Sequence, residues 1–210
     1  MKPIPDSGFL YPNLFVRIML LSVEDVAGVN GVKAILNMAG QRDLIGNYPP
    51  MNMDKGIDIA RYSMIMAAID NLYGDKGGQI LAMRAGNANF QVALKMMGEI
   101  PGFSAVNSED RSIEERAEAG LCLVRTVITG EKATSIPRTE DGQFLYAVKN
   151  CPICLGRTTT TPRCYLTAGL LQGAMRWATG GLEFNVKHVR SHSCGNPTCD
   201  YIIPLTPMEK

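Results

Sequence analysis

Five of the six cysteines and both histidines lie in the last third of this 210-residue chain. Cys151 and Cys154 form a Cys-Pro-Ile-Cys pair, Cys164 follows, and Cys194 and Cys199 flank a Gly-Asn-Pro turn. Two thiolates at this spacing can reach one ion, and metal sites with such ligands take about four nitrogen or sulfur atoms. The clustering therefore predicts a bound metal in the C-terminal part of the chain.

His188 is a further candidate ligand. In a strand predicted over 183–192, alternation puts His188 on the same face as Phe184 and Val186, which is the core side. A buried imidazole needs a metal or a hydrogen-bond partner. The alternative is that the cysteines are small buried hydrophobes and that backbone groups satisfy the histidines. Five cysteines within 151–199 favour the metal.

Two other uses of the thiols stay open. A thioredoxin-like redox role for Cys151 and Cys154 is disfavoured because the pair precedes no βαβ unit, although a low-pKa thiol beside a helix N-terminus is compatible with it. An iron–sulfur cluster takes the same cysteine ligands as zinc and is the lesser alternative.

Composition limits the function classes. With 46% hydrophobic residues the chain can form one sizeable core. Its net charge of +1, without a long run of either sign, lacks the basic surface typical of nucleic-acid binding. The longest early apolar stretch, 14–23, is about half of a bilayer span. The N-terminus with Pro3, Pro5 and Asp6 does not resemble a secretory signal, so we expect a cytoplasmic protein without a membrane span.

The first half of the chain has helical periodicity. The strongest signal is Ser112-Ile-Glu-Glu115, which has the form of a capping box and precedes a helix that ends at Gly130. We expect Gly86 to mark a close helix crossing. The predicted helical segments are 11–28, 32–39, 57–74, 80–97 and 112–130.

The second half is rich in strand signals. The predicted elements are strands 133–136 and 144–148 joined through Asp141-Gly142, a helix over 165–178, and strands 183–192 and 199–204. This order predicts an α+β fold, in which N-terminal helices pack on a small antiparallel sheet of two hairpins separated by a helix. We expect a single domain over 1–210, with a helical part over 1–130 and a metal- and ligand-binding part over 131–206.

Common catalytic motifs are absent from the sequence. It contains no dinucleotide-binding G-x-G-x-x-G, P-loop, H-E-x-x-H or G-x-S-x-G, so no catalytic residue is assigned. Methionines and aromatic residues share the predicted helices, where they can line an adaptable pocket, although core filling is favoured. These residues are Tyr62, Met64, Met66, Tyr73, Met83, Phe90, Met96 and Met97.

The C-terminal part resembles the 4-vinyl reductase domain family. The resemblance lies in Cys151-Pro-Ile-Cys-Leu-Gly156, Cys164, Leu170-Leu-Gln-Gly173 and Gly195-Asn-Pro-Thr-Cys199-Asp-Tyr201, and is strongest over 131–204. The family is named from a bacteriochlorophyll-biosynthesis protein and includes aromatic-sensing domains. Its fold resembles that of Bet3 subunits. The resemblance implies a dimer with an apolar cavity and a zinc ion near its mouth.

The resemblance also implies a ligand set. Cys164 and Cys199 match two of the family's zinc ligands, whereas the glutamate and the other cysteine position hold His188 and Ser191. His188 can supply a nitrogen, and Cys194 can supply the missing sulfur. The implied zinc ligands are therefore Cys164, His188, Cys194 and Cys199, with Cys151 and Cys154 as alternatives.

We therefore expect a homodimeric domain that binds a hydrophobic, aromatic or tetrapyrrole molecule and carries a structural zinc. The alternative is a reductase or accessory protein acting on the vinyl group of a bacteriochlorophyll precursor, which would need an electron donor that the sequence does not show. A third interpretation is a Bet3-like interaction module. The ligand-binding residues are not predicted, because they depend on packing.

Overall fold

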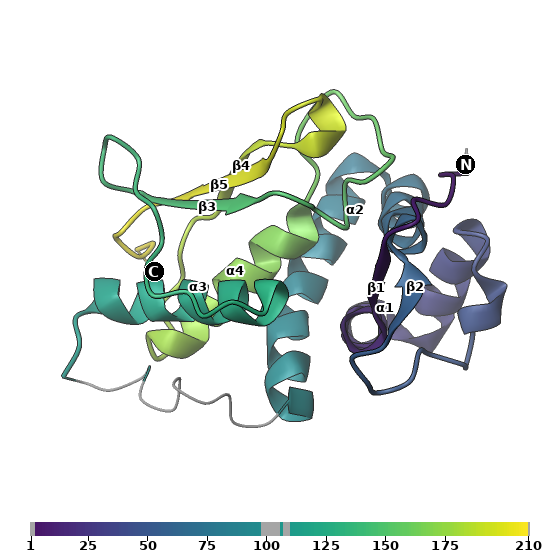
Figure 1. Cartoon of the computed structure of the whole chain (residues 1–210), viewed down its shortest axis with the longest axis horizontal. Coiled ribbons are helices and arrows are strands. Elements are labelled where there is room, and N and C mark those ends of the chain that lie inside the picture. The colour runs from purple at the N-terminus through teal and green to yellow at the C-terminus, as the bar shows by residue number, and fades with distance from the viewer. Residues whose placement is uncertain (1–2, 98–105, 107–109, 210) are drawn as a thin grey trace.

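The fold combines long helices with two small antiparallel sheets (Figure 1). The computed structural model describes residues 3–97, 106 and 110–209. The elements are β1 (Leu10–Pro12), α1 (Asn13–Met38), η1 (Arg42–Leu44), β2 (Lys55–Asp58), α2 (Ile59–Met97), α3 (Ile113–Thr129), β3 (Phe144–Val148), α4 (Tyr165–Ala178), β4 (Lys187–Arg190), η2 (His192–Cys194) and β5 (Cys199–Ile203).

Glycines divide both of the long N-terminal helices. Gly28 interrupts α1 with φ of 73°, and Gly74 interrupts α2 with φ of 68°. Only glycine adopts a positive φ without a steric cost in free energy, so the regular helix is interrupted at these residues, as the sequence predicts. After Gly74 the chain resumes the helix at once, so the gap between the predicted helical segments 57–74 and 80–97 is itself helical.

Helices α3 and α4 begin and end at the predicted residues. The Ser112 hydroxyl accepts a hydrogen bond from the Glu115 N–H, and the Glu115 carboxylate accepts one from the Ser112 N–H, which confirms the capping box. Gly130 ends α3 in the left-handed conformation. Helix α4 occupies 165–178, the range that the sequence predicted.

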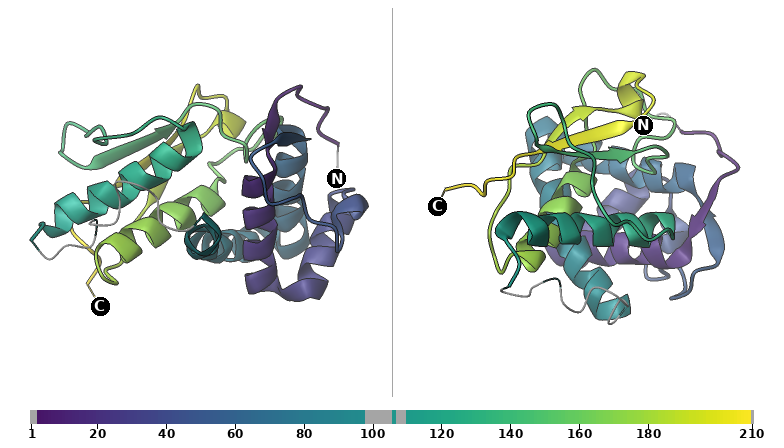
Figure 2. Two further views of the ribbon diagram at one scale, coloured as in Figure 1. Left: turned by 60° about the horizontal axis from the view of Figure 1, so that its bottom comes forward. Right: turned by 60° about the vertical axis from the view of Figure 1, so that its left-hand side comes forward.

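The larger sheet has the order β3-β5-β4 with antiparallel pairing, and α3 and α4 lie against one face of it (Figures 1 and 2). The α+β class is confirmed. The expected strand at 133–136 is absent from the described sheet, where only Arg138 bridges to Phe144 ahead of β3. Side chains of α3 bind this segment instead, because Thr126 Oγ1 accepts from the Ala133 N–H and Glu118 from the Ile136 N–H.

The α2–α4 crossing joins the two halves of the molecule. A Cβ atom at Gly86 would overlap the backbone of Leu166, and one at Gly169 would overlap the carbonyl of Met83. A Cβ atom at Gly173 would lie 3.1 Å from the Asn87 carbonyl oxygen, which is a tight contact rather than an overlap. The expected close crossing at Gly86 is therefore confirmed, and glycine is required there because the two backbones touch.

Buried side chains from both halves form one continuous cluster that surrounds this crossing. Within the described residues, no helix is long and apolar enough to cross a membrane. The assignment of a single domain stays a prediction.

Gly86→Ala is expected to destabilise the protein by about 1–3 kcal/mol, because the added methyl group forces the α2 and α4 backbones apart. Arg84→Ala, on the exposed face of the same helix, is the matched control and should change stability by less than about 0.5 kcal/mol. The free energy of unfolding, from urea titration followed by circular dichroism, measures both. Equal stability of the two variants would show that the crossing has room for a side chain.

Candidate functional site

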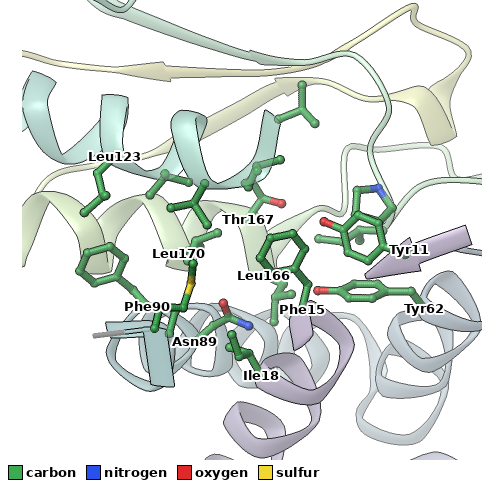
Figure 3. Close-up of a pocket in the computed structure, with 18 of the residues that line it drawn as sticks. Tyr11, Phe15, Ile18, Tyr62, Asn89, Phe90, Leu123, Leu166, Thr167 and Leu170 are labelled. Atoms are coloured by element: carbon green, nitrogen blue, oxygen red, sulfur yellow. The ribbon is translucent and has the colours of Figure 1, made fainter. Parts of the chain in front are cut away.

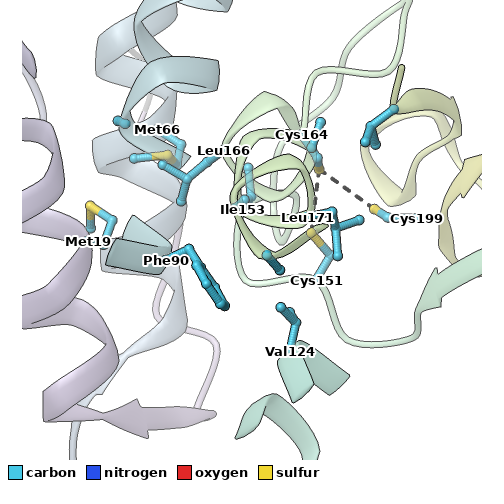
Figure 4. Close-up of a cluster of buried hydrophobic side chains, with 14 of the residues drawn as sticks. Met19, Met66, Phe90, Val124, Cys151, Ile153, Cys164, Leu166, Leu171 and Cys199 are labelled. Atoms are coloured by element: carbon cyan, nitrogen blue, oxygen red, sulfur yellow. Dashed lines mark hydrogen bonds between the residues drawn. The ribbon is translucent and has the colours of Figure 1, made fainter. Parts of the chain in front are cut away.

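Four cysteines converge where the loop after β3 meets the N-terminus of α4 and the start of β5. The Sγ atoms of Cys151, Cys154, Cys164 and Cys199 all lie within 4.8 Å of one another, and all four residues are buried. Cys164 Sγ is 3.4 Å from Cys151 Sγ and 3.7 Å from Cys199 Sγ, as the dashed lines in Figure 4 mark. Cys199 Sγ is 3.5 Å from Cys154 Sγ. Cys154 and Cys164 are joined as a disulfide.

Hydrogen-bond donors surround these sulfurs. The His192 backbone N–H donates to Cys199 Sγ, and Ser191 Oγ lies 3.2 Å from Cys154 Sγ. The Cys151 thiol, followed by the His188 ring and the His192 N–H, holds the pKa of Cys199 well below its ordinary value, although burial opposes this shift. The same contact and burial raise the pKa of Cys151. The cluster therefore favours a thiolate on Cys199.

The predicted ligand set is only partly assembled. Cys164 and Cys199 meet, and they meet the alternative candidates Cys151 and Cys154. Cys194 lies outside the group, half-buried, with its Sγ 3.6 Å from Thr159 Oγ1.

Both histidines also lie outside the four-cysteine group. His188 is adjacent to it: its Nδ1 accepts from the Cys164 N–H at 3.2 Å, and its ring stacks on Tyr201 at 4.5 Å. His192 contacts the Lys149 carbonyl. The assignment of particular residues to a metal stays a prediction.

The remaining cysteine has a packing role. Cys122 is buried on α3 away from the cluster, and burial raises its pKa to about 11. A thiol with such a pKa stays protonated at neutral pH and acts as a small hydrophobic side chain.

Two contacts anchor the cysteine loop to α2. The Ser63 hydroxyl donates to the Pro152 carbonyl at 2.6 Å. Arg157, which follows the loop, forms an ion pair with Asp70 of α2 at 2.5 Å, and their side chains are only 7% and 15% exposed. Burial raises the pKa of Asp70, and the Arg157 guanidinium opposes that shift. The loop therefore has a fixed position against α2.

An apolar pocket of about 100 Å³ lies beside this loop, between α1, α2, α3 and α4 (Figure 3). Phe15 and Ile18 come from α1, Phe90 from α2, and Leu123 from α3. The other lining residues are Tyr11, Tyr62, Asn89, Ala93, Leu94, Met97, Val124, Val127, Ile128, Val148, Pro152, Ile153, Leu166, Thr167 and Leu170. The pocket shares a wall with the cysteine cluster, because Pro152 and Ile153 lie between Cys151 and Cys154.

Two tyrosines supply the polar edge of the pocket. Tyr11 and Tyr62 pack edge to face with centroids 5.8 Å apart, and both hydroxyls point into the cavity (Figure 3). Burial raises the pKa of both side chains, so each hydroxyl keeps its proton and can donate it to a ligand. Thr167 also directs its hydroxyl toward this space.

The sequence predicted helices rich in methionine and aromatic residues but not which of them form the pocket. Tyr62, Phe90 and Met97 line it, whereas Met64 and Met66 are buried in the core and Tyr73 is exposed. Helical periodicity identifies the buried face of each helix, and this signal is the same for a core position and for a pocket wall.

Solved structures with the same fold include three H-NOX proteins. One is an H-NOX protein from S. oneidensis in the Fe(II)NO ligation state, 12% identical, with a TM-score of 0.55 and coverage of 92% of this chain and 99% of that one. A second structure, described as probing the function of heme distortion in the H-NOX family, is 15% identical, with a TM-score of 0.57 and coverage of 95% of this chain and 97% of that one. A T. tengcongensis H-NOX variant is 17% identical, with a TM-score of 0.54 and coverage of 92% and 96%.

The chain has the H-NOX fold. No protein-family model matches it, and no curated protein matches it. The resemblance to 4-vinyl reductase domains and to Bet3 subunits is therefore wrong, since the matching folds are H-NOX domains. The expected link to bacteriochlorophyll biosynthesis is overturned by the same finding. Short motifs around the cysteines and glycines of 151–201 suggested that family, but such residues recur wherever a tight turn or a sulfur cluster is built.

The cofactor expectation is corrected as well. The structures that share this fold are described through heme and NO, and they give no support to zinc or to an iron–sulfur cluster as the cofactor of this chain. Those ions had been suggested by the clustering of the cysteines and, for zinc, by the resemblance to 4-vinyl reductase domains.

Heme itself does not fit the pocket. Among the described residues, those that line it include no histidine, no cysteine and no charged side chain. Heme iron is held by His, Cys or Tyr, or by Met together with His, so Met97 of the lining lacks the histidine partner, and tyrosine ligation is opposed because burial raises the pKa of Tyr11 and Tyr62. Propionates would lie against apolar walls without a cation. The cavity is also smaller than the roughly 300–1,000 Å³ usual for drug-sized ligands.

Asp70→Asn is expected to destabilise the protein by about 3–5 kcal/mol, because it leaves the Arg157 charge buried without its partner. Asp43→Asn removes the carboxylate of an exposed ion pair with Arg61 and should cost less than about 1 kcal/mol. Urea unfolding followed by the fluorescence of Trp177 measures the difference. A loss for Asp70→Asn no larger than the control would contradict the anchoring of the cysteine loop.

Proposed function

We propose that this chain is a binding domain for a small, uncharged aromatic molecule that occupies the pocket between α1, α2, α3 and α4. The observation that carries the proposal is the composition of that pocket: apolar walls, with the Tyr11 and Tyr62 hydroxyls directed inward at one edge (Figure 3). A ligand of one ring with a hydroxyl or carbonyl group satisfies both features.

The energetics favour such a ligand. An apolar cavity of about 150 Å³ stays dry and binds benzene, so this smaller apolar space of about 100 Å³ suits a ligand no larger than one ring. Each square ångström of apolar surface removed from water contributes about 25 cal/mol. An ionised ligand would lose its hydration without gaining a counter-charge, because the described lining is uncharged. The pocket therefore selects against charge and, through the two tyrosines, for one polar group.

A binding role also agrees with the lining chemistry. The only ionisable side chains among the described residues that line the pocket are the two tyrosines, and burial raises their pKa values further above neutral pH. General acid–base catalysis needs a group whose pKa lies near the working pH. The pocket is therefore suited to holding a molecule rather than to converting it.

Phenol is expected to bind the purified protein saturably and to change the emission of Trp177. This is the only tryptophan, and its ring is 5.7 Å from that of Phe90 in the pocket wall. Ala93→Phe fills the cavity and should weaken binding at least about tenfold, which is about 1.4 kcal/mol. Ala34→Phe, the same substitution on the exposed face of α1, should leave binding unchanged. Calorimetric titration gives the affinities.

Unsaturable binding, or equal affinity in the two phenylalanine variants, would refute the pocket as the site. Hemin is the second ligand to test. A 1:1 complex with a ligated-heme absorbance spectrum that Ala93→Phe abolishes would show that the pocket is a heme site and would overturn the proposal of an uncharged aromatic.

We also propose that the domain is a homodimer located in the cytoplasm, as expected from the sequence. The small β1–β2 sheet is surrounded by exposed apolar side chains, namely Phe9, Leu10, Met51 and Met53. Light scattering after gel filtration should give twice the chain mass of 22.9 kDa. Phe9→Asp should shift the protein toward monomer, whereas Val29→Asp, at an exposed position of α1, should not. A monomer in the unmodified protein would refute the dimer.

A further inference from the structure

We propose that Cys151, Cys154, Cys164 and Cys199 together bind one thiophilic metal ion through four thiolates when the protein is reduced. Nothing in this inference depends on the ligand of the apolar pocket. It rests on the positions of four buried sulfurs contributed by three separate segments of the chain.

The distances between the sulfurs match a tetrahedral ion site. A tetrahedron with metal–thiolate bonds of about 2.3 Å has edges of roughly 3.8 Å. Three of the observed Sγ–Sγ separations are 3.4, 3.5 and 3.7 Å, and every pair lies within 4.8 Å. Soft ions are the ones that select thiolate ligands. A central ion would thus contact all four sulfurs with small movements.

The backbone spacing favours an ion over a lasting disulfide. The Cα atoms of Cys154 and Cys164 are 6.9 Å apart, just beyond the 4.4–6.8 Å usual for disulfides. A dithiol or phosphine reductant supplies the two electrons that convert this bond into two thiols, and it is itself oxidised to a disulfide or a phosphine oxide. Binding of a divalent ion to the four thiolates then releases to the buffer the protons that the thiols still carry.

The surroundings supply the outer shell that thiolates need. The His192 N–H donates to Cys199 Sγ at 3.4 Å, and Ser191 Oγ lies 3.2 Å from Cys154 Sγ and 3.8 Å from Cys199 Sγ. His188 binds the Cys164 backbone N–H and so fixes the start of α4. Donors of this kind orient the sulfur ligands of a metal ion and offset their negative charge. Ser191 and His188 therefore act beside the ion rather than on it.

Cobalt(II) is the probe for this site. The full-length protein, reduced with a phosphine and kept free of oxygen, is titrated with Co²⁺. We expect one equivalent to produce the intense d–d bands and the sulfur-to-cobalt charge-transfer absorbance of a tetrahedral tetrathiolate. Cys151→Ser and Cys199→Ser should each weaken or blue-shift these bands, and Cys194→Ser and Cys122→Ser, which change the cysteines outside the cluster, should preserve them.

A second measurement guards against variants that fail to fold. The chemical shift of ¹¹³Cd bound to the unmodified protein counts its sulfur ligands, and we expect four. Absence of cobalt binding by the reduced protein, an octahedral spectrum, a ¹¹³Cd shift for fewer than four sulfurs, or loss of the signal in Cys194→Ser would each overturn the assignment. Binding of phenol is measured separately, so failure of the metal site and failure of the pocket are distinguishable.

Discussion

The direct contact between the backbones of α2 and α4 is the constraint on which the rest of the structure depends. Gly86 and Gly169 permit it, because a Cβ at either position would overlap the other helix. At this distance α4 brings Leu166, Thr167 and Leu170 to the pocket and places Cys164 at its own N-terminus. The same α2 segment supplies Asn89 and Phe90. A wider crossing would separate the pocket walls and move Cys164 from its partners.

The loop between β3 and α4 is the second constraint, because its neighbouring residues belong to both sites. Cys151 and Cys154 point into the sulfur cluster, whereas Pro152 and Ile153 line the pocket. The loop is held from outside by the Ser63 hydrogen bond and the Arg157–Asp70 ion pair. One tight turn therefore contributes residues to both sites.

Local signals in the sequence predicted local structure well. The capping box at Ser112, the ends of α4 and the glycine breaks at Gly28 and Gly74 depend on a few neighbouring residues, and the structure has them. The strand predicted at 133–136 failed because its backbone N–H groups bind side chains of α3, which lie distant in sequence. β-propensity describes a segment, whereas strand formation also needs a free edge to pair with.

The two candidate sites also differ in how far the sequence predicts them. Clustering of cysteines identified Cys151, Cys154, Cys164 and Cys199 as a group, but it could not separate them from Cys194, whose distance from the others depends on how η2 turns before β5. The pocket depends on four helices at once and has no sequence signature of its own. Its residues look like core residues until the helices are placed.

The comparison with H-NOX domains concerns the fold alone. At 12–17% identity the alignment covers more than nine-tenths of the chain, but a shared fold does not fix which molecule the cavity binds. Both histidines of this chain lie near the sulfur cluster and outside the described pocket lining, so the cavity has no imidazole for iron. What remains is an apolar space with protonated phenols at one edge. In such a space, only a neutral ligand with a single polar group can replace its lost hydration by contacts with the protein.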